Sequence, residues 1–155
     1  MIWIQAIYQP TTLFSLRPSW TTSSGGKSLL LPSPYALKTA VLDAAIRTSG
    51  LGQAEQAWPW IRDMGIGVQL PPQIVVTNLF AKILRLRRNP ATPGSADVGP
   101  FQKTIAYREY VYHPQPITLA FAVPDGQAAQ LGDWLAQISY LGKRGGFVQL
   151  LAPPI

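Results

Sequence analysis

Apolar and polar positions along this chain follow two periods, one typical of strands and the other typical of helices. Residues 2–8 form a β-branched and aromatic run that predicts a first, central strand. Residues 34–48 place apolar side chains three and four positions apart, which predicts a helix with one buried face. A shorter helix, EQAWPWIRDMG at 55–65, is predicted within 51–65, with Pro59 in its first turns and a packing stripe at Trp58, Ile61 and Met64. A last helix is predicted over 125–140. Fifteen prolines argue against a helical bundle, so the chain is predicted to mix helices and strands.

Further runs rich in β-branched and aromatic residues predict more strands. They lie at 65–70, 73–86, 101–112, 117–123 and 147–151. The two long runs flank a stretch of Pro, Gly, Ala and Ser at 89–100, which is typical of the tip of a long hairpin. We therefore predict a hairpin arm at about 79–107.

The order of these elements is strand, helix, strands, strand, helix, strand. This is the α+β plan of ferredoxin-like and RRM-like domains, βαββαβ, here with an arm inserted in its middle. The length of 155 residues suits a single domain over 1–155. Such domains present an open sheet face and loops and commonly bind RNA, although a fold alone does not determine a function.

Charge and composition narrow the class of partner. Charged residues make up only 13% of the chain, and thirteen Lys or Arg stand against seven Asp or Glu. A basic excess on a sparsely charged chain favours a polyanionic partner, while a solvated basic surface stays open as the alternative. The absence of cysteine excludes disulfides, thiol catalysis and Cys-based zinc sites. Because no leader pattern or membrane span is found, we expect a cytoplasmic protein.

The stretch from the first strand to the first helix carries a candidate anion site. The strand before it ends at Arg17, and a polar loop with glycines at 21–28 carries Lys27. Ser33 is a plausible N-cap for the helix that follows. A basic residue on each flank of a glycine loop at a strand-to-helix turn predicts a place for an anionic backbone.

A P-loop interpretation of the same stretch fails. The run SGGKS at 24–28 needs a glycine where Thr21 stands, and a helix should begin at its Lys-Ser pair. Residues 29–32 read LLLP instead, which is not a helix start. Nucleotide hydrolysis is therefore not predicted.

Other basic residues gather in a second glycine loop at 142–146 and at the foot of the predicted arm. The loop at 142–146 is interpreted either as a phosphate-binding loop or as an ordinary helix-to-strand turn with a glycine C-cap. Tyr107, Tyr110 and Tyr112 can stack on bases or serve as cross-strand partners. The candidate RNA-binding residues are Arg17, Lys27, Lys38, Lys82, Arg85, Arg87, Arg88, Lys103, Arg108, Lys143 and Arg144.

His113 is the only histidine, so a histidine metal cluster is excluded. It is a weak catalytic candidate, as the base in RNA cleavage by an internal 2′-hydroxyl. The alternative, which we favour, is a surface residue at a strand end. The seven carboxylates are scattered without a pair on a helix face, so neither a metal nor another cofactor is predicted.

Three blocks of sequence together resemble a known family. They are LFSLRP with a polar loop and LLLPSPYALKTAVLDAAI, then TIAYREYVYHPQPITLAFAV, then YLGKRGGFVQLL. Their order resembles the Cas-five family of RAMP proteins, the CRISPR-associated subunit that caps the 5′ end of guide RNA in Cascade-type complexes.

The resemblance implies an RRM-like domain with a protruding β-thumb that grips the repeat-derived 5′ handle of the guide RNA (crRNA). It implies contact with neighbouring backbone and large subunits of Cascade, and no membrane. Carried over, Arg17, Lys27 and the loop at 142–146 would face RNA. Some members cleave precursor RNA with a Tyr, Lys and His set, of which only His113 and nearby tyrosines have counterparts here. The chain is short for the family, which implies a reduced or absent C-terminal subdomain.

From these observations we predict a non-catalytic crRNA-binding subunit of a type I, Cascade-like CRISPR interference complex, a ribonucleoprotein of antiviral defense. One alternative is a metal-independent endoribonuclease that processes precursor crRNA. Another is a protein-interaction module without direct RNA contact, which the low charge and five tryptophans also fit.

Overall fold

A four-stranded antiparallel sheet forms the body of the protein. The computed structural model describes residues 1–21, 26–89, 91–94 and 98–155. The sheet contains β1 (Ile2–Pro10), β2 (Gly65–Gln69), β5 (Ile117–Val123) and β6 (Val148–Leu150), in the order β2-β5-β1-β6. The two middle strands, β1 and β5, pair from Ile2 with Val123 to Tyr8 with Ile117. This strand order confirms the predicted ferredoxin-like α+β fold.

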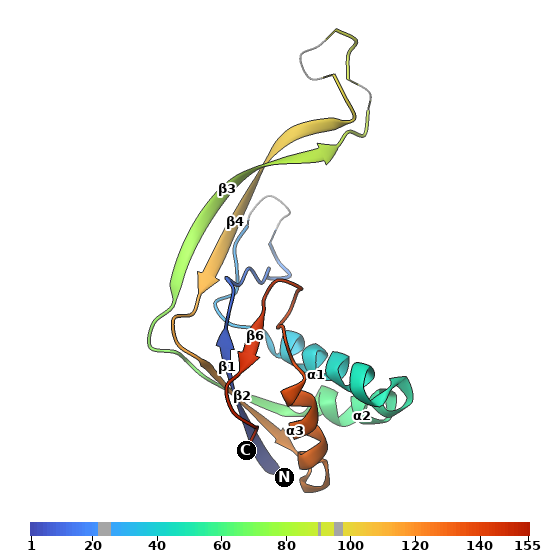
Figure 1. Cartoon of the computed structure of the whole chain (residues 1–155), viewed down its shortest axis with the longest axis vertical. Helices are drawn as coiled ribbons and strands as arrows, with labels where there is room; N and C mark the ends of the chain where they lie inside the picture. Colours follow the sequence, from blue (N-terminus) through green and yellow to red (C-terminus); the bar gives the residue numbers. More distant parts are fainter. Residues whose placement is uncertain (22–25, 90, 95–97) are drawn as a thin grey trace.

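Three helices lie on one side of this sheet (Figure 1). They are α1 (Pro34–Ser49), α2 (Leu51–Asp63) and α3 (Ala128–Ala136), the last preceded by the 3-10 turn η1 (Asp125–Gln127). Every second residue of β1 from Ile4 is buried, as a strand with one face under helices requires. The Tyr8 side chain on this face donates to the backbone oxygen of Leu135 in α3, at 2.7 Å. None of the described helices combines the length and apolar character needed to cross a membrane.

Helix boundaries agree with the sequence at α1 and differ in the other two helices. The Ser33 side chain accepts from the backbone N–H of Ala36 at 3.2 Å, which confirms the predicted N-cap. Pro59 lies deep inside α2, so its predicted place in the first turns is wrong. Ala54, Ala57 and Ile61 are buried, so the packed face of α2 extends back toward the start of the helix. This packing outweighs the free-energy cost of the backbone hydrogen bond that Pro59 removes.

The last helix is shorter than predicted, because it ends at Ala136 rather than near 140. The following residues pair as strand instead. Tyr140 bridges Phe147, and the backbone N–H of Val148 donates to the oxygen of Ser139 at 3.0 Å. This pairing brings the loop at 142–146 back toward the sheet.

A long hairpin extends away from the body and forms a separate two-stranded sheet (Figure 1). Its strands are β3 (Val75–Leu86) and β4 (Phe101–Tyr112), paired from Val75 with Tyr112 to Leu86 with Phe101. The strands predicted at 101–112 and 117–123 are confirmed. Parts of the predicted loop at 21–28 and of the tip at 89–100, namely 22–25, 90 and 95–97, lie outside the described residues.

Candidate nucleic-acid interface

The edge of β4 that does not face β3 joins the hairpin to the body. Phe14 and Val111 exchange two backbone hydrogen bonds, of 2.8 and 2.7 Å. Two residues before Val111 in β4, the backbone N–H of Glu109 donates to the oxygen of Gly26 at 2.6 Å. The segments around Phe14 and 26–28 therefore lie along the same strand edge.

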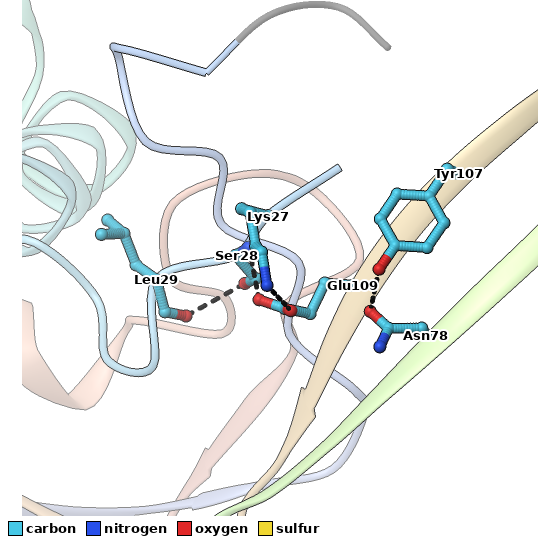
Figure 2. Close-up of polar contacts among 6 residues, drawn as sticks. All are labelled: Lys27, Ser28, Leu29, Asn78, Tyr107 and Glu109. Atoms are coloured by element: carbon cyan, nitrogen blue, oxygen red, sulfur yellow. Dashed lines mark hydrogen bonds and ion pairs between the residues drawn. The ribbon is translucent and has the colours of Figure 1, made fainter. Parts of the chain in front are cut away.

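Glu109 also binds this second segment through its side chain (Figure 2). Its Oε1 accepts from the backbone N–H of Ser28 at 3.0 Å, and its Oε2 lies 3.2 Å from Lys27 Nζ. The side chain of Glu109 is only 8% exposed. The Ser28 N–H holds the pKa of this carboxyl below its usual range, and Lys27 adds to the effect while burial opposes it. Glu109 is therefore a charged anchor for the loop.

A cleft of about 620 Å³ lies between the hairpin, the start of α1 and the loop at 142–146. Five of the predicted RNA-binding residues line it: Arg17, Lys27, Arg85, Arg108 and Lys143. They come from five separate parts of the chain, so only the fold brings them together. The first turns of α1 contribute Ser33, Tyr35 and Thr39, and Tyr35 is 76% exposed.

The cleft favours an anionic ligand. Arg17 donates to the backbone oxygen of Thr21 at 2.6 Å, which places its guanidinium at the cleft. Burial lowers the pKa of Lys143, and the charge of Arg108 lowers it further. In the part of the chain that the structure describes, Lys27 is the one lining cation that forms an ion pair with a carboxylate. The remaining positive charges are available to phosphate groups.

The loop at 142–146 reaches the cleft because it packs on the segment after β1. Gly142 has a φ of 81°, and a Cβ there would lie 2.5 Å from the Leu16 side chain. The Thr12 hydroxyl donates to the oxygen of Gly145 at 2.6 Å and accepts from the N–H of Phe147 at 2.9 Å. The simple C-cap interpretation of this loop is wrong, since α3 ends six residues before Gly142.

The other predicted cations lie outside the cleft lining. Lys38 donates to the backbone oxygen of Arg62 at 2.5 Å and so joins α1 to α2. Strand alternation places Lys82 and Lys103 on the hairpin face opposite that of Arg85 and Arg108. Arg144, Arg87 and Arg88 also lie outside the lining, and Arg87 donates through Nε to the oxygen of Phe101 at 3.2 Å. RNA contact by these residues stays a prediction.

His113 is fully buried, so its placement at the surface is wrong. Its ring makes an edge contact with Phe14, with centroids 5.5 Å apart, and it does not line the cleft. Neither ring nitrogen has a hydrogen-bond partner among the described residues. The Pro that follows it suggested a strand end, but packing of the hairpin base against the body covers the ring. Its position gives a base no access to a ligand in the cleft.

Replacing His113 with leucine is expected to flatten the dependence of stability on pH. Burial lowers the pKa of His113, and the nearby Leu30 backbone opposes this only in part. The unfolded histidine titrates near about 6.5, so the unfolded state binds more protons than the folded state. Stability is therefore fully present above that pH and falls as pH drops through the folded pKa. Thermal melting from about pH 8 to about pH 5 checks this; parallel curves for both proteins would contradict it.

Sequence reasoning missed Glu109 and Ser28, and it did not explain why residue 26 is a glycine. A Cβ on Gly26 would lie 2.1 Å from the backbone oxygen of Tyr107. These contacts join residues about eighty positions apart, so no local pattern reveals them. The one available signal was a lone acid in the basic and aromatic run of β4, within the block AYREY.

No family model matches the chain. A relative, the CRISPR-associated protein Cas5 of Archaeoglobus fulgidus, is 30% identical over 143 residues, which cover 92% of this chain and 60% of that protein. The chain thus spans 60% of the length of this relative.

Two solved structures share the fold. A chain in the cryo-EM structure of the Type III-B Cmr-beta bound to cognate target RNA gives a TM-score of 0.64 at 11% identity, covering 97% of this chain and 58% of that one. The crystal structure of a CRISPR protein from Archaeoglobus fulgidus gives a TM-score of 0.56 at 17% identity. The match covers 100% of this chain and 63% of that one. The relative from Archaeoglobus fulgidus confirms the resemblance of the sequence blocks to Cas5, and the two solved structures confirm the fold.

Proposed function

We propose that this chain, a homologue of the CRISPR-associated protein Cas5, is a crRNA-binding subunit of a CRISPR effector complex. The observation that carries the proposal is the cleft in which Arg17, Lys27, Arg85, Arg108 and Lys143 meet. Positive charge collected from separate segments into one hollow suits a bent single strand, whose phosphates follow an irregular path. The exposed ring of Tyr35 at this cleft supplies a surface on which a base can stack.

More finely, we propose that the bound segment is the repeat-derived 5′ handle and that the complex is of type I. Both statements rest on the resemblance to Cascade subunits, and the cleft is compatible with them. It is closed on one side by the hairpin and on another by the loop at 142–146, so it suits one defined segment better than a long continuous strand.

The hairpin supports a second kind of contact, with neighbouring subunits of the complex. Large apolar side chains stand exposed on one of its faces outside the cleft lining, with Phe80 71% and Leu86 70% exposed. Leu84 and Phe101 share that face and are also exposed. An apolar surface of this kind marks a protein contact more often than a solvated arm. RNA binding in the cleft and protein contact along the arm are compatible in one subunit.

Co-expression with the neighbouring genes, followed by sequencing of the RNA that copurifies, tests the proposal. We expect one RNA class with a fixed, repeat-derived 5′ end. RNA with random ends, or no RNA, would contradict it and favour an interaction module. Added precursor crRNA should stay intact with the purified chain alone, because the buried His113 does not reach the cleft. Metal-independent cleavage would favour the endoribonuclease alternative.

A further inference from the structure

We propose that Glu109 is a positioning residue, whose carboxylate holds the segment 26–28 on β4 and so sets the cations of the cleft relative to one another. The inference rests on the proposed RNA-binding function of that cleft. It assigns to Glu109 a role that its charge alone would not suggest, since a carboxylate repels phosphate.

The geometry consists of a short chain of hydrogen bonds across three segments. The backbone N–H of Leu16 donates to the Ser28 hydroxyl at 2.9 Å, and the backbone N–H of Ser28 donates to Glu109 Oε1 at 3.0 Å. Each of these three residues has a cleft cation as its immediate neighbour in sequence. The neighbours are Arg17, Lys27 and Arg108.

Neighbouring Cα atoms are about 3.8 Å apart, so fixing the three bonded residues fixes the backbones of the three cations. Figure 2 shows the bonded residue Ser28 and the adjacent cation Lys27 converging on the Glu109 carboxylate from one side. The Glu109 backbone N–H adds a third bond to the same segment, through the oxygen of Gly26 at 2.6 Å. One residue of β4 thus holds three consecutive residues of the loop.

A positioning role and a purely electrostatic role predict opposite changes in RNA affinity when Glu109 is replaced, which makes the role testable. Glu109→Ala removes a negative charge from a basic cleft, so electrostatics alone predicts tighter binding of RNA. If the carboxylate positions the cations, the same variant binds RNA more weakly, because Ser28 loses its acceptor. Glu109→Gln removes the charge but keeps an oxygen for the Ser28 N–H, so it should bind at least as tightly as the wild type.

The experiment measures binding of fluorescein-labelled oligouridine by anisotropy for the wild type, Glu109→Ala and Glu109→Gln. With three phosphate contacts displaced, we expect Glu109→Ala to bind about tenfold or more weakly, and Glu109→Gln to bind within about threefold of the wild type or more tightly. Glu55→Ala is the matched control, because this exposed carboxylate on α2 carries the same charge away from the cleft. It should leave binding unchanged within about twofold, apart from the long-range charge effect.

Amide hydrogen exchange at Ser28 tests the positioning role without RNA. Exchange should speed up in Glu109→Ala and stay near the wild-type rate in Glu109→Gln, with an unchanged far-ultraviolet spectrum. Tighter RNA binding by both variants, or unchanged Ser28 exchange in Glu109→Ala, overturns the proposal. Faster exchange in Glu109→Ala but not in Glu109→Gln, with a wild type that binds no oligouridine, supports the positioning role and contradicts general binding of single-stranded RNA in the cleft.

Discussion

Replacing Arg17, Arg108 and Lys143 together with alanine is expected to weaken RNA binding by about 100-fold at 0.1 M salt. The three cations line one cleft and form no ion pair with a carboxylate within the described residues. Each phosphate contact with a single strand contributes about 0.7 to the slope of log affinity against log salt. Three lost contacts therefore lower that slope by about 2 and the affinity at 0.1 M by about two orders of magnitude.

The matched control replaces Lys82, Arg88 and Lys103 with alanine. It removes the same total charge, but from hairpin residues that lie outside the cleft lining. None of the three lines the cleft, and Lys82 and Lys103 lie on the hairpin face opposite Arg85 and Arg108, so they act on a ligand in the cleft only through screened long-range attraction. We therefore expect the control to lose about threefold or less. Titrations of labelled single-stranded RNA at several salt concentrations measure both effects. Equal losses for the two triple variants would contradict a binding surface centred on the cleft and would indicate that net charge alone governs binding.

Much of the fold could be predicted from the sequence because its signals are local. The period of apolar positions in α1 and the Ser33 cap are properties of a few adjacent residues, and both predictions are confirmed. The hairpin strands were visible as two β-branched runs around a Pro and Gly stretch. Where local signals failed, tertiary packing decided the outcome. Pro59 stands inside α2, and residues 139–140 pair as strand instead of extending α3.

The candidate site was only partly predictable, because the folded structure decides which side chains line the same cleft. Charge counting found all five lining cations, but it gave equal weight to six others. Lys143 lines the cleft while the adjacent Arg144 does not, and Arg85 lines it while Lys82 does not. Alternation along a strand and the path of a glycine loop make these distinctions, and neither is visible in composition.

Burial of polar groups was the hardest feature to predict. His113 was predicted at the surface and Glu109 was not singled out, yet only 0% and 6% of their areas are exposed. The Glu109 carboxylate is compensated by two hydrogen bonds, from Lys27 Nζ and from the Ser28 N–H. Both are covered because the hairpin base folds against segments that come long before it in the chain.

Replacing Gly26 with alanine is expected to lower the free energy of unfolding by about 3 kcal/mol, through overpacking and lost hydrogen bonds. The added Cβ would lie 2.1 Å from the backbone oxygen of Tyr107 and 2.6 Å from the Cα of Arg108. Both atoms belong to a strand held by its pairing with β3, so they do not yield cheaply. The segment 26–28 must therefore lift from β4, which breaks its bonds to Glu109 and displaces Lys27.

Replacing Gly132 with alanine is the control, and it should raise the free energy of unfolding instead of lowering it. Gly132 lies inside α3, and a Cβ there would meet nothing within 4 Å. Alanine loses less backbone entropy than glycine in a helix, so Gly132→Ala should stabilise the protein by about 0.5–1 kcal/mol. In thermal melting we expect Gly26→Ala to lower Tm by about 6–12 °C and Gly132→Ala to raise it by about 1–4 °C. If Gly26→Ala melts like the wild type and Ser28 exchanges at its usual rate, the loop does not lie on β4, and the cleft loses the anchor that assembles its cations.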